Sequence, residues 1–514
     1  MDAIDIPTVL AGLPPRISEI VRLRARATPD AQALADGARA WTYAQLADAV
    51  DASAKLLRDL GVRAGDRLMV VGENCAAQVA LVFAAASIDA WIVNVNARLS
   101  AREIAAIRDH SGARRVVYTI GSSPDAAAHA ARHGATLHGD LMIGPLNTEC
   151  SPEPVDEGGG QVAALIYTTG TTGHPKGVML THRNLMFIAT VSSSLRGLTP
   201  QDRAYGVLPI SHVYGLASVM LGTLYAGACL CLVPRFSAEA LLRAIRDEGL
   251  TILQGVPAMY ARLLEMLAGS VARLPSRLRF IYAGGSPLDP NLKQQVEKLF
   301  GLPLHNGYGM TESSPTISQT RFDAPRSDTS VGFAIPGIEL RIVDVGGADV
   351  APGEPGELWV RGPNVMKGYY REPELTAATM RDGGWLNTGD VARREADGAL
   401  FIVGRTKELI IRSGFNVYPL EIETVLNAHP GVTQSAVVGR SVAGGNEEVV
   451  AFVEADARHP ASVQELHDYL AQRLSPYKRP SEIVIMPALP AAATGKILKG
   501  QLQALAQTMP STKP

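Results

Sequence analysis

Apolar and polar positions alternate in blocks along the first part of the chain, and the blocks predict strands and helices in turn. Residues 67–71 and 91–95 are short apolar runs, which are typical of buried strands. Between them, residues 76–86 form an alanine-rich stretch that predicts a helix. A further amphipathic helix is expected to begin at Thr42, a favoured capping residue, and to end before Gly61. Strands that alternate with helices predict a parallel sheet with crossover helices.

The rest of the chain divides into two further regions. Three consecutive glycines at residues 158–160 mark a loop, and the repeated Pro-Gly pairs that follow it indicate β-rich structure with tight turns. The last part combines apolar strands with helix starts at Pro419 and Ser462. We therefore expect an α/β protein. It has a large N-terminal domain of layered α/β sheets plus a β-rich subdomain over residues 1–404, and a small, mobile α+β C-terminal domain over residues 405–514.

One stretch imitates a membrane span, because residues 204–234 contain no charged side chain. A spanning helix needs about 20 apolar residues, so the length alone would allow it. However, Pro209, Ser211, His212 and four glycines interrupt the stretch. We interpret it as a strand, a polar turn, a buried helix and a second strand, and a membrane span remains the alternative.

Composition narrows the classes of partner. The 514 residues include 48 Lys+Arg and 50 Asp+Glu, so no basic excess favours nucleic acid or an anionic membrane as the main partner. Four cysteines in so long a chain argue against a disulfide framework, and no Cys–His pairing typical of zinc sites is seen. The start of the chain lacks a signal-peptide pattern, so we expect a cytoplasmic protein. Its oligomeric state, monomer or homodimer, stays open.

The segment that says most about chemistry extends from Tyr167 to Gly177 and reads Tyr-Thr-Thr-Gly-Thr-Thr-Gly-His-Pro-Lys-Gly. Its threonines supply hydroxyl groups, its glycines let backbone N–H groups approach a ligand, and Lys176 adds a positive charge. It differs from a Walker loop, because Gly177 and an apolar run follow the lysine where a helix would begin. A polar surface turn is the alternative, but this density of Thr, Gly and Lys predicts a polyphosphate site.

At several separated motifs the chain resembles the adenylate-forming enzymes, which include acyl- and aryl-CoA synthetases, peptide-synthetase adenylation domains and luciferases. The resemblance extends from about Ala27 to Leu505, with the motifs in the family's order. It rests on residues 167–177, 283–287, 306–312, 388–390, 404–407 and 490–498. It implies that the chain makes an acyl-adenylate from a carboxylic acid and ATP with Mg²⁺, releases pyrophosphate, and passes the acyl group to the thiol of CoA.

The resemblance also implies residue roles around the nucleotide. The residues expected to bind ATP or AMP are Thr168, Thr169, Gly170, Thr171, Thr172, Gly173, Lys176, Gly284, Gly285, Ser286, Asn306, Gly307, Tyr308, Gly309, Met310, Thr311, Asp390, Arg405 and Lys496. Glu312 and Thr171 are expected to hold Mg²⁺. Lys496 would bridge the acid's carboxylate and the α-phosphate, because an anion that attacks a polyanion needs cations to offset the repulsion. Lys176 and His212 complete the expected catalytic set.

Two further sites follow from the same resemblance. His212 would form an aromatic gate between the acyl pocket and the CoA tunnel, with a buried structural histidine as the alternative. The expected acyl pocket comprises His212, Tyr214, Gly215, Gly284, Met310 and Ser313. The expected CoA contacts are Ser413, Gly414, Phe415, Tyr477 and Arg479. Lys407 occupies the family's hinge position, and rotation about it would exchange Lys496 for the CoA-binding face.

The sequence leaves the acid itself open. No arginine or lysine occurs in the expected acyl-pocket segments, which disfavours a dicarboxylate. An apolar pocket suits a medium-chain fatty acid or an aromatic acid such as a benzoate or cinnamate. Two other functions remain alternatives: an adenylation enzyme that loads a carrier protein, and a non-catalytic nucleotide-binding protein of the same fold. Lys176, Glu312, Asp390 and Lys496 argue against the second.

Overall fold

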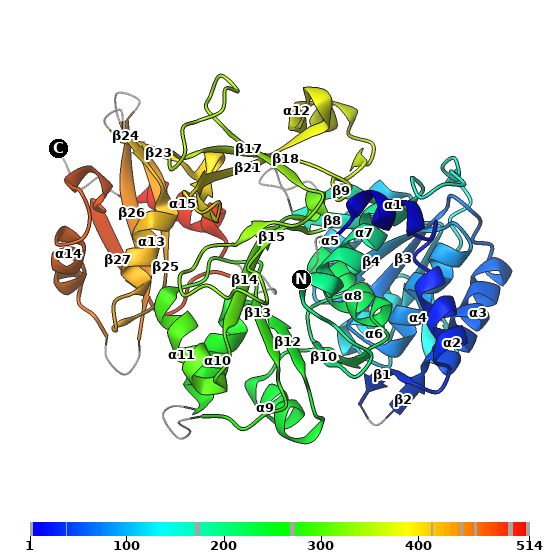
Figure 1. Cartoon of the computed structure of the whole chain (residues 1–514). Coiled ribbons are helices and arrows are strands. Elements are labelled where there is room, and N and C mark those ends of the chain that lie inside the picture. Colours follow the sequence, from blue (N-terminus) through cyan, green and yellow to red (C-terminus); the bar gives the residue numbers. More distant parts are fainter. Residues whose placement is uncertain are drawn as a thin grey trace.

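The structure is a computed structural model, and two large sheets form most of it (Figure 1). The structure describes residues 4–37, 39–169, 175–267, 273–412, 415–442, 446–456, 460–491 and 497–509. The first sheet has eight strands within these residues. In spatial order they are β19 (Gly368–Tyr369), β9 (Pro175–Thr181), β8 (Val162–Thr169), β4 (Trp91–Asn96), β3 (Arg67–Gly72), β5 (Arg115–Tyr118), β7 (Leu141–Ile143) and β6 (Thr136–His138).

The second sheet brings together strands from both ends of the N-terminal region. In spatial order its described strands are β16 (Phe333–Ala334), β15 (Thr316–Gln319), β14 (Leu304–Gly309), β13 (Phe280–Ala283), β12 (Ile252–Gly255), β10 (Arg203–Gly206), β11 (Cys229–Leu232), β1 (Gln32–Asp36) and β2 (Arg39–Thr42). Strands β12, β13 and β14 are parallel neighbours, so their carboxyl ends meet at one edge of the sheet.

Helices cover the two sheets. The described helices of the N-terminal region are α1 (Ile6–Gly12), α2 (Glu19–Ala27), α3 (Tyr43–Asp59), α4 (Ala76–Ser87), α5 (Ala101–Ser111), α6 (Pro124–Arg132), α7 (His182–Leu195), α8 (Gly222–Tyr225), α9 (Ala238–Asp247), α10 (Pro257–Leu267), α11 (Pro290–Phe300) and α12 (Pro373–Thr379). Thr42 caps α3 through a reciprocal bond with Gln45, as its sequence predicts. Helix α4 is buried on nearly all sides, because it lies between the sheets and its alanines leave little side chain to exclude.

Two smaller blocks complete the chain and lie at the top and left of Figure 1. The β-rich block consists of β17 (Glu339–Val343), β18 (Gly356–Arg361), β20 (Met380–Arg381), β21 (Trp385–Arg394) and β22 (Leu400–Arg405). The C-terminal block consists of β23 (Ile410–Arg412), β24 (Phe415–Val417), α13 (Pro419–Asn427), β25 (Val432–Val442), β26 (Asn446–Ala455), α14 (Val463–Ala471), β27 (Glu482–Met486) and α15 (Lys499–Thr508). The predicted fold class is confirmed: layered α/β sheets, a β-rich subdomain and a small α+β domain.

The uncharged stretch folds as a core element. Strand β10, a π-helix over Tyr214–Leu221, helix α8 and strand β11 follow one another, and nearly all of their side chains are buried. Cys229 and Cys231 are buried free thiols, as expected. Among the described residues, no helix is long and apolar enough to cross a membrane. The strand–turn–helix–strand interpretation is therefore confirmed.

A substitution at Gly332 tests how closely the loop between β15 and β16 packs against Gln319. Its φ is +74°, and an added Cβ would lie 2.1 Å from the carbonyl carbon and oxygen of Gln319. Gly353 has a φ of +87° with nothing within 4 Å of its Cβ position. Gly332→Ala should therefore lower the melting temperature clearly more than Gly353→Ala, which bears only the backbone strain of about 1–3 kcal/mol. Differential scanning fluorimetry measures both, and equal shifts would contradict the close packing.

Candidate functional site

The predicted nucleotide residues gather where strands from different sheets end side by side. Gly284 and Gly285 follow β13, and Met310 follows β14. Asp390 and Arg405 lie opposite each other on the antiparallel pair β21 and β22. Ligand sites in open α/β sheets commonly lie beyond the carboxyl ends of parallel strands, and this site has that position.

Asp390 is the central side chain of the site. It is 4% exposed, its Oδ2 accepts a hydrogen bond from the Tyr308 hydroxyl, and its Oδ1 lies 3.0 Å from Nε of Arg405. Burial and the Asp390 charge raise the pKa of Tyr308 above its ordinary value, so the phenol stays protonated and donates. Burial alone would lower the pKa of Arg405, but Asp390 and Glu408 raise it. One carboxylate thus joins β14, β21 and β22.

Cationic and acidic groups surround this carboxylate. Nζ of Lys176 lies 5.9 Å from the ring centre of Tyr369. Burial, Arg405 and Lys176 lower the pKa of Lys407, so both of these cations lie within electrostatic reach of Lys407. Such a group of positive charges suits a polyphosphate, because it offsets the charge of several phosphate oxygens at once.

Glu312 is the described candidate ligand for a divalent cation. Its Oε1 accepts a hydrogen bond of 2.6 Å from the Tyr369 hydroxyl, which fixes the direction of the carboxylate. Within the described ranges, no group of three or more His, Cys, Asp or Glu side chains lies together as a metal site. One carboxylate is nevertheless a fitting donor for Mg²⁺, which commonly binds one or two protein carboxylates together with substrate phosphates.

The paired strands β8 and β9 flank the expected phosphate loop in the sequence. Thr168 of β8 is opposite Lys176 of β9, and Tyr167 is opposite Gly177. An added Cβ at Gly177 would lie 3.1 Å from the Tyr167 ring, so the strands pack closely. Thr181 then caps α7. The predicted residues Gly170, Thr171, Thr172 and Gly173, and the side chain of Thr169, lie outside the described residues.

Other predicted nucleotide residues hold the backbone in place. The side-chain amide of Asn306 donates to the carbonyl oxygens of Thr329 and Ser330, both at 3.1 Å. The Ser313 hydroxyl donates to the carbonyl oxygen of Met310 at 3.0 Å. Thr311 is buried, whereas Ser286 lies exposed after the Gly284–Gly285 turn. Their roles toward a ligand stay predictions.

Tyr214 and its neighbours lie beside the glycines of the expected acyl pocket. An added Cβ at Gly284 would come within 3.3–3.4 Å of the Tyr214 ring and hydroxyl. An added Cβ at Gly215 would lie 2.1 Å from the carbonyl oxygen of Pro209, so this position admits no side chain. His212 is exposed, and its Nδ1 accepts a hydrogen bond of 3.2 Å from the backbone N–H of Tyr214. The alternative of a buried structural histidine is wrong.

Three residues that sequence reasoning missed belong to this site. Tyr369 holds Glu312, and Tyr282 packs against Tyr214 with ring centres 6.3 Å apart. Arg196 is 1% exposed and lies 4.8 Å above the Tyr282 ring. Arg196 follows the last turn of α7, where a cation is ordinarily a solvated helix-end residue, so its burial left no signal in the sequence.

The predicted CoA contacts lie on the C-terminal block. Phe415, 53% exposed, stacks on Tyr477 with ring centres 4.6 Å apart. Arg479 instead donates to the carbonyl oxygens of Leu474 and Ala471, at 2.8 and 2.9 Å, beyond the end of α14. The predicted residues Ser413, Gly414 and Lys496 lie outside the described residues.

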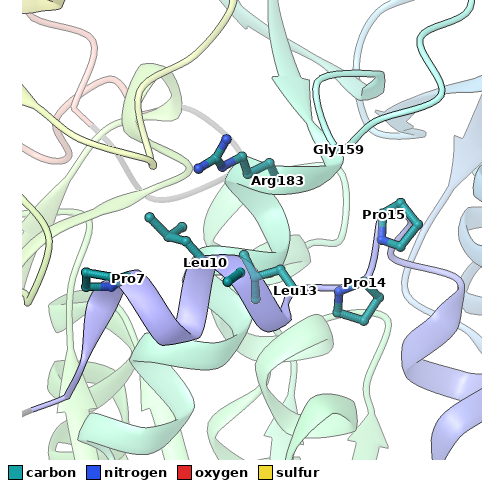
Figure 2. A pocket seen from close by; sticks show the side chains of 8 residues that line it. Pro7, Leu10, Leu13, Pro14, Pro15, Gly159 and Arg183 are labelled. Carbon is teal, nitrogen blue, oxygen red and sulfur yellow. The ribbon is translucent and has the colours of Figure 1, made fainter.

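A hollow of about 590 Å³ lies elsewhere, between α1 and the start of α7 (Figure 2). Its lining comprises Pro7, Leu10, Ala11, Leu13, Pro14, Pro15, Gly159 and Arg183. None of these is a predicted site residue, and Arg183 is the one charged group among them. The hollow therefore offers little chemistry, and the site around Asp390 is the better candidate.

Comparisons with known proteins identify the family of the chain. The model of the AMP-binding enzyme family matches residues 21–370, and the model of its C-terminal domain matches residues 421–496. The chain is 36% identical to a feruloyl-CoA synthase of Amycolatopsis sp over 93% of this chain and 97% of that protein. It is 34% identical to an indoleacetate–CoA ligase of Aromatoleum aromaticum, over 95% and 98%.

Solved structures give the same result. The chain is similar to the o-succinylbenzoate CoA synthetase from Bacillus subtilis in complex with its acyl-adenylate intermediate. The TM-score is 0.81 at 31% identity, and the match covers 94% of this chain and 97% of that chain.

Asp390→Asn tests the centre of the site. The amide keeps the size of the side chain but removes the charge that Arg405 and Tyr308 share, so affinity for AMP should fall by ~10–100-fold, the weight of a charge-assisted hydrogen bond. Isothermal titration calorimetry with AMP measures it. Asp349→Asn, which removes an exposed partner of Arg341, is the matched control and should leave affinity unchanged. Equal affinity in both variants would refute the assignment of Asp390.

Proposed function

Since this chain belongs to the AMP-binding enzyme family, we propose that it is an ATP-dependent ligase that joins an aromatic carboxylic acid to CoA. The observation that carries the proposal is the Tyr308–Asp390–Arg405 network with Lys176 and Glu312 beside it. It combines a buried acceptor for ribose hydroxyls, cations for phosphates and a carboxylate for Mg²⁺.

In the first step a carboxylate oxygen of the acid attacks the α-phosphorus of ATP. The bond from the α-phosphorus to the oxygen that bridges it to the β-phosphorus breaks, and pyrophosphate leaves. Asp390 accepts hydrogen bonds from the ribose hydroxyls, and its contacts with Arg405 and Tyr308 fix the orientation of its carboxylate. Lys176 and Lys496 offset the repulsion between the attacking anion and the phosphates. Glu312 would hold Mg²⁺, which would supply further charge neutralisation when bound.

In the second step the thiol sulfur of CoA attacks the carbonyl carbon of the acyl-adenylate, and AMP leaves as the carbon–oxygen bond to phosphate breaks. Lys407, just before the C-terminal block, is the proposed hinge about which that block rotates. Phe415 and Tyr477 offer a stacked aromatic surface for CoA, and Ser413 and Gly414 stay predicted CoA contacts. His212, exposed at the start of the π-helix, is suited to gate the thiol's approach.

An aromatic acid is favoured over a medium-chain fatty acid. Tyr214 and Tyr282 place two rings beside the glycines of the acyl pocket, and edge-to-face ring contacts stabilise an aromatic guest. The names of the relatives also point to aromatic acids: ferulate, indoleacetate and succinylbenzoate. The four free thiols suit a reducing compartment, so we place the enzyme in the cytoplasm.

The direct test is product analysis by mass spectrometry. The chain is incubated with ATP, Mg²⁺ and CoA and with benzoic, cinnamic, indoleacetic or medium-chain acids. We expect AMP and an aryl-CoA in equal amounts, and loss of both when EDTA removes Mg²⁺, because the phosphates then lose their counter-charge.

Two other outcomes contradict the proposal in different ways. Formation of acyl-CoA from fatty acids alone would show that the acid class is wrong. AMP release that is indifferent to CoA, with a carrier protein as the better acceptor, would favour the adenylation enzyme instead.

A further inference from the structure

Arg196 is a buried cation without a buried anion beside it. The side chain is 1% exposed, and in the described part of the chain it forms no ion pair. Its Nη1 donates to Oε1 of Gln254 at 2.7 Å and to the carbonyl oxygen of Ser218 at 3.4 Å. Burying a charge without a counter-charge is costly, and here only dipoles and a ring face offset it.

The ring face belongs to Tyr282. The Arg196 guanidinium lies 4.8 Å from the centre of that ring, in the range of a cation–π contact. Burial raises the pKa of Tyr282, and the Arg196 charge acts in the opposite direction. A phenol beside a cation is a stronger hydrogen-bond donor than an ordinary tyrosine, because the cation stabilises charge on the phenol oxygen.

Several polar atoms around this pair have no partner in the described structure. They are Nε of Arg196, Nε2 of Gln254 and the hydroxyl of Tyr214, and all three side chains are more than nine-tenths buried. Buried polar atoms are normally hydrogen-bonded, so such a group of unsatisfied atoms at one place needs an explanation. A bound ligand with polar atoms is one explanation, because it would supply the missing hydrogen-bond partners.

The two faces of β14 locate this group relative to the nucleotide site. Successive side chains of a strand point to opposite faces. The Tyr308 side chain points toward Asp390, so the missing side chain of Gly307 would lie on the opposite face of β14. There an added Cβ would lie 1.9 Å from the Tyr282 hydroxyl. An added Cβ at Gly284 would likewise meet both Tyr282 and Tyr214. Both tyrosines therefore lie beside Gly284, a residue of the expected acyl pocket, and the Tyr282 hydroxyl also lies beside Gly307.

We propose that Tyr282, with Arg196 behind it, is the specificity-determining hydrogen-bond donor of the acyl pocket, and that it selects aromatic acids with an oxygen acceptor on the ring edge away from the reacting carboxyl group. The inference rests on the proposed function. Tyr282 contacts the substituent, whereas Arg196 is a positioning residue that acts through Tyr282. A hydroxyl, a methoxy or a second carboxylate shares the required chemistry, because each offers an oxygen lone pair.

Arg196 is a cation beside Tyr282 that the expected pocket segments themselves do not contain. The expected pocket segments contain no arginine or lysine, but Arg196 arrives from the end of α7, about 110 residues before Gly307 in the chain. A site built to hydrogen-bond a substrate group rejects the analogue that lacks it more strongly than an apolar pocket rejects one extra methylene.

The test measures kcat/KM for benzoate and cinnamate and for their 4-hydroxy, 4-methoxy and 4-carboxy derivatives, with ATP, Mg²⁺ and CoA. We expect the wild-type enzyme to favour the oxygen-substituted acids by at least ~10-fold over the better parent acid. The three derivatives separate the sources of the acceptor. A higher kcat/KM for the 4-carboxy than for the 4-methoxy acid means that Arg196 acts by charge. A preference for the 4-hydroxy acid alone means that the pocket recognises a hydrogen-bond donor on the substrate, which overturns the proposal.

Three variants test the residues by the ratio of substituted to parent kcat/KM, which general damage to the fold does not change. Tyr282→Phe keeps the ring but removes the hydroxyl, so the ratio should fall toward 1. Arg196→Met should lower the ratio similarly, and Arg196→Lys should restore part of it. Tyr205→Phe is the matched control. The buried Tyr205 hydroxyl also has no described hydrogen-bond partner. Its pKa is influenced by charges on and just after α9, among them Glu248, and not by Arg196. The ratio should therefore stay at the wild-type value.

The outcomes separate this inference from the proposed function. Activation of aromatic acids with a ratio near 1 in the wild type, or an unchanged ratio in Tyr282→Phe and Arg196→Met, would overturn the inference alone. Failure to activate any of the acids would contradict the proposed function and this inference with it.

Discussion

The bond between Tyr308 and Asp390 is the interaction on which the site depends. It joins the end of β14, in one of the two large sheets, to β21 of the β-rich block, and the ion pair of Asp390 with Arg405 extends the connection to β22. Arg405 is the last residue of β22 and stands two residues before Lys407. In the proposed function this carboxylate orients the nucleotide, and it lies close in the fold to the proposed hinge at Lys407. Its low exposure strengthens each hydrogen bond, because the local dielectric constant is low.

Strand β14 divides the site into two environments with opposite chemistry. On the Tyr308 side, charges dominate: Asp390, Arg405 and, at a greater distance, Lys176 and Glu312. On the Gly307 side, tyrosine rings dominate, and Arg196 is the one cation in the described part of that wall. This separation suits a reaction that joins a polyanion to an apolar acid. In the proposed function each reactant binds at its own face, and the reacting atoms meet at the end of the strand.

Much of this organisation could be predicted from the sequence. The apolar runs gave β3 and β4, the capping residues gave the starts of α3 and α14, and proline gave the start of α13, because these signals depend on local chemistry. The candidate nucleotide residues could be named from the sequence because they stand in short motifs. Arg196 and Tyr282 were not, since one resembles a helix-end cation and the other a core residue of a strand. Their meaning arises only when tertiary packing brings α7 against β13.

The central claim is that the chain activates a carboxylic acid as its adenylate, and isotope exchange between labelled pyrophosphate and ATP tests it most directly. The exchange reports the reversal of the first step and needs no CoA. The account predicts exchange that depends on Mg²⁺ and on an aromatic acid and that is greatly reduced in Asp390→Asn. No exchange with any carboxylic acid, or exchange that proceeds equally without one, would contradict it.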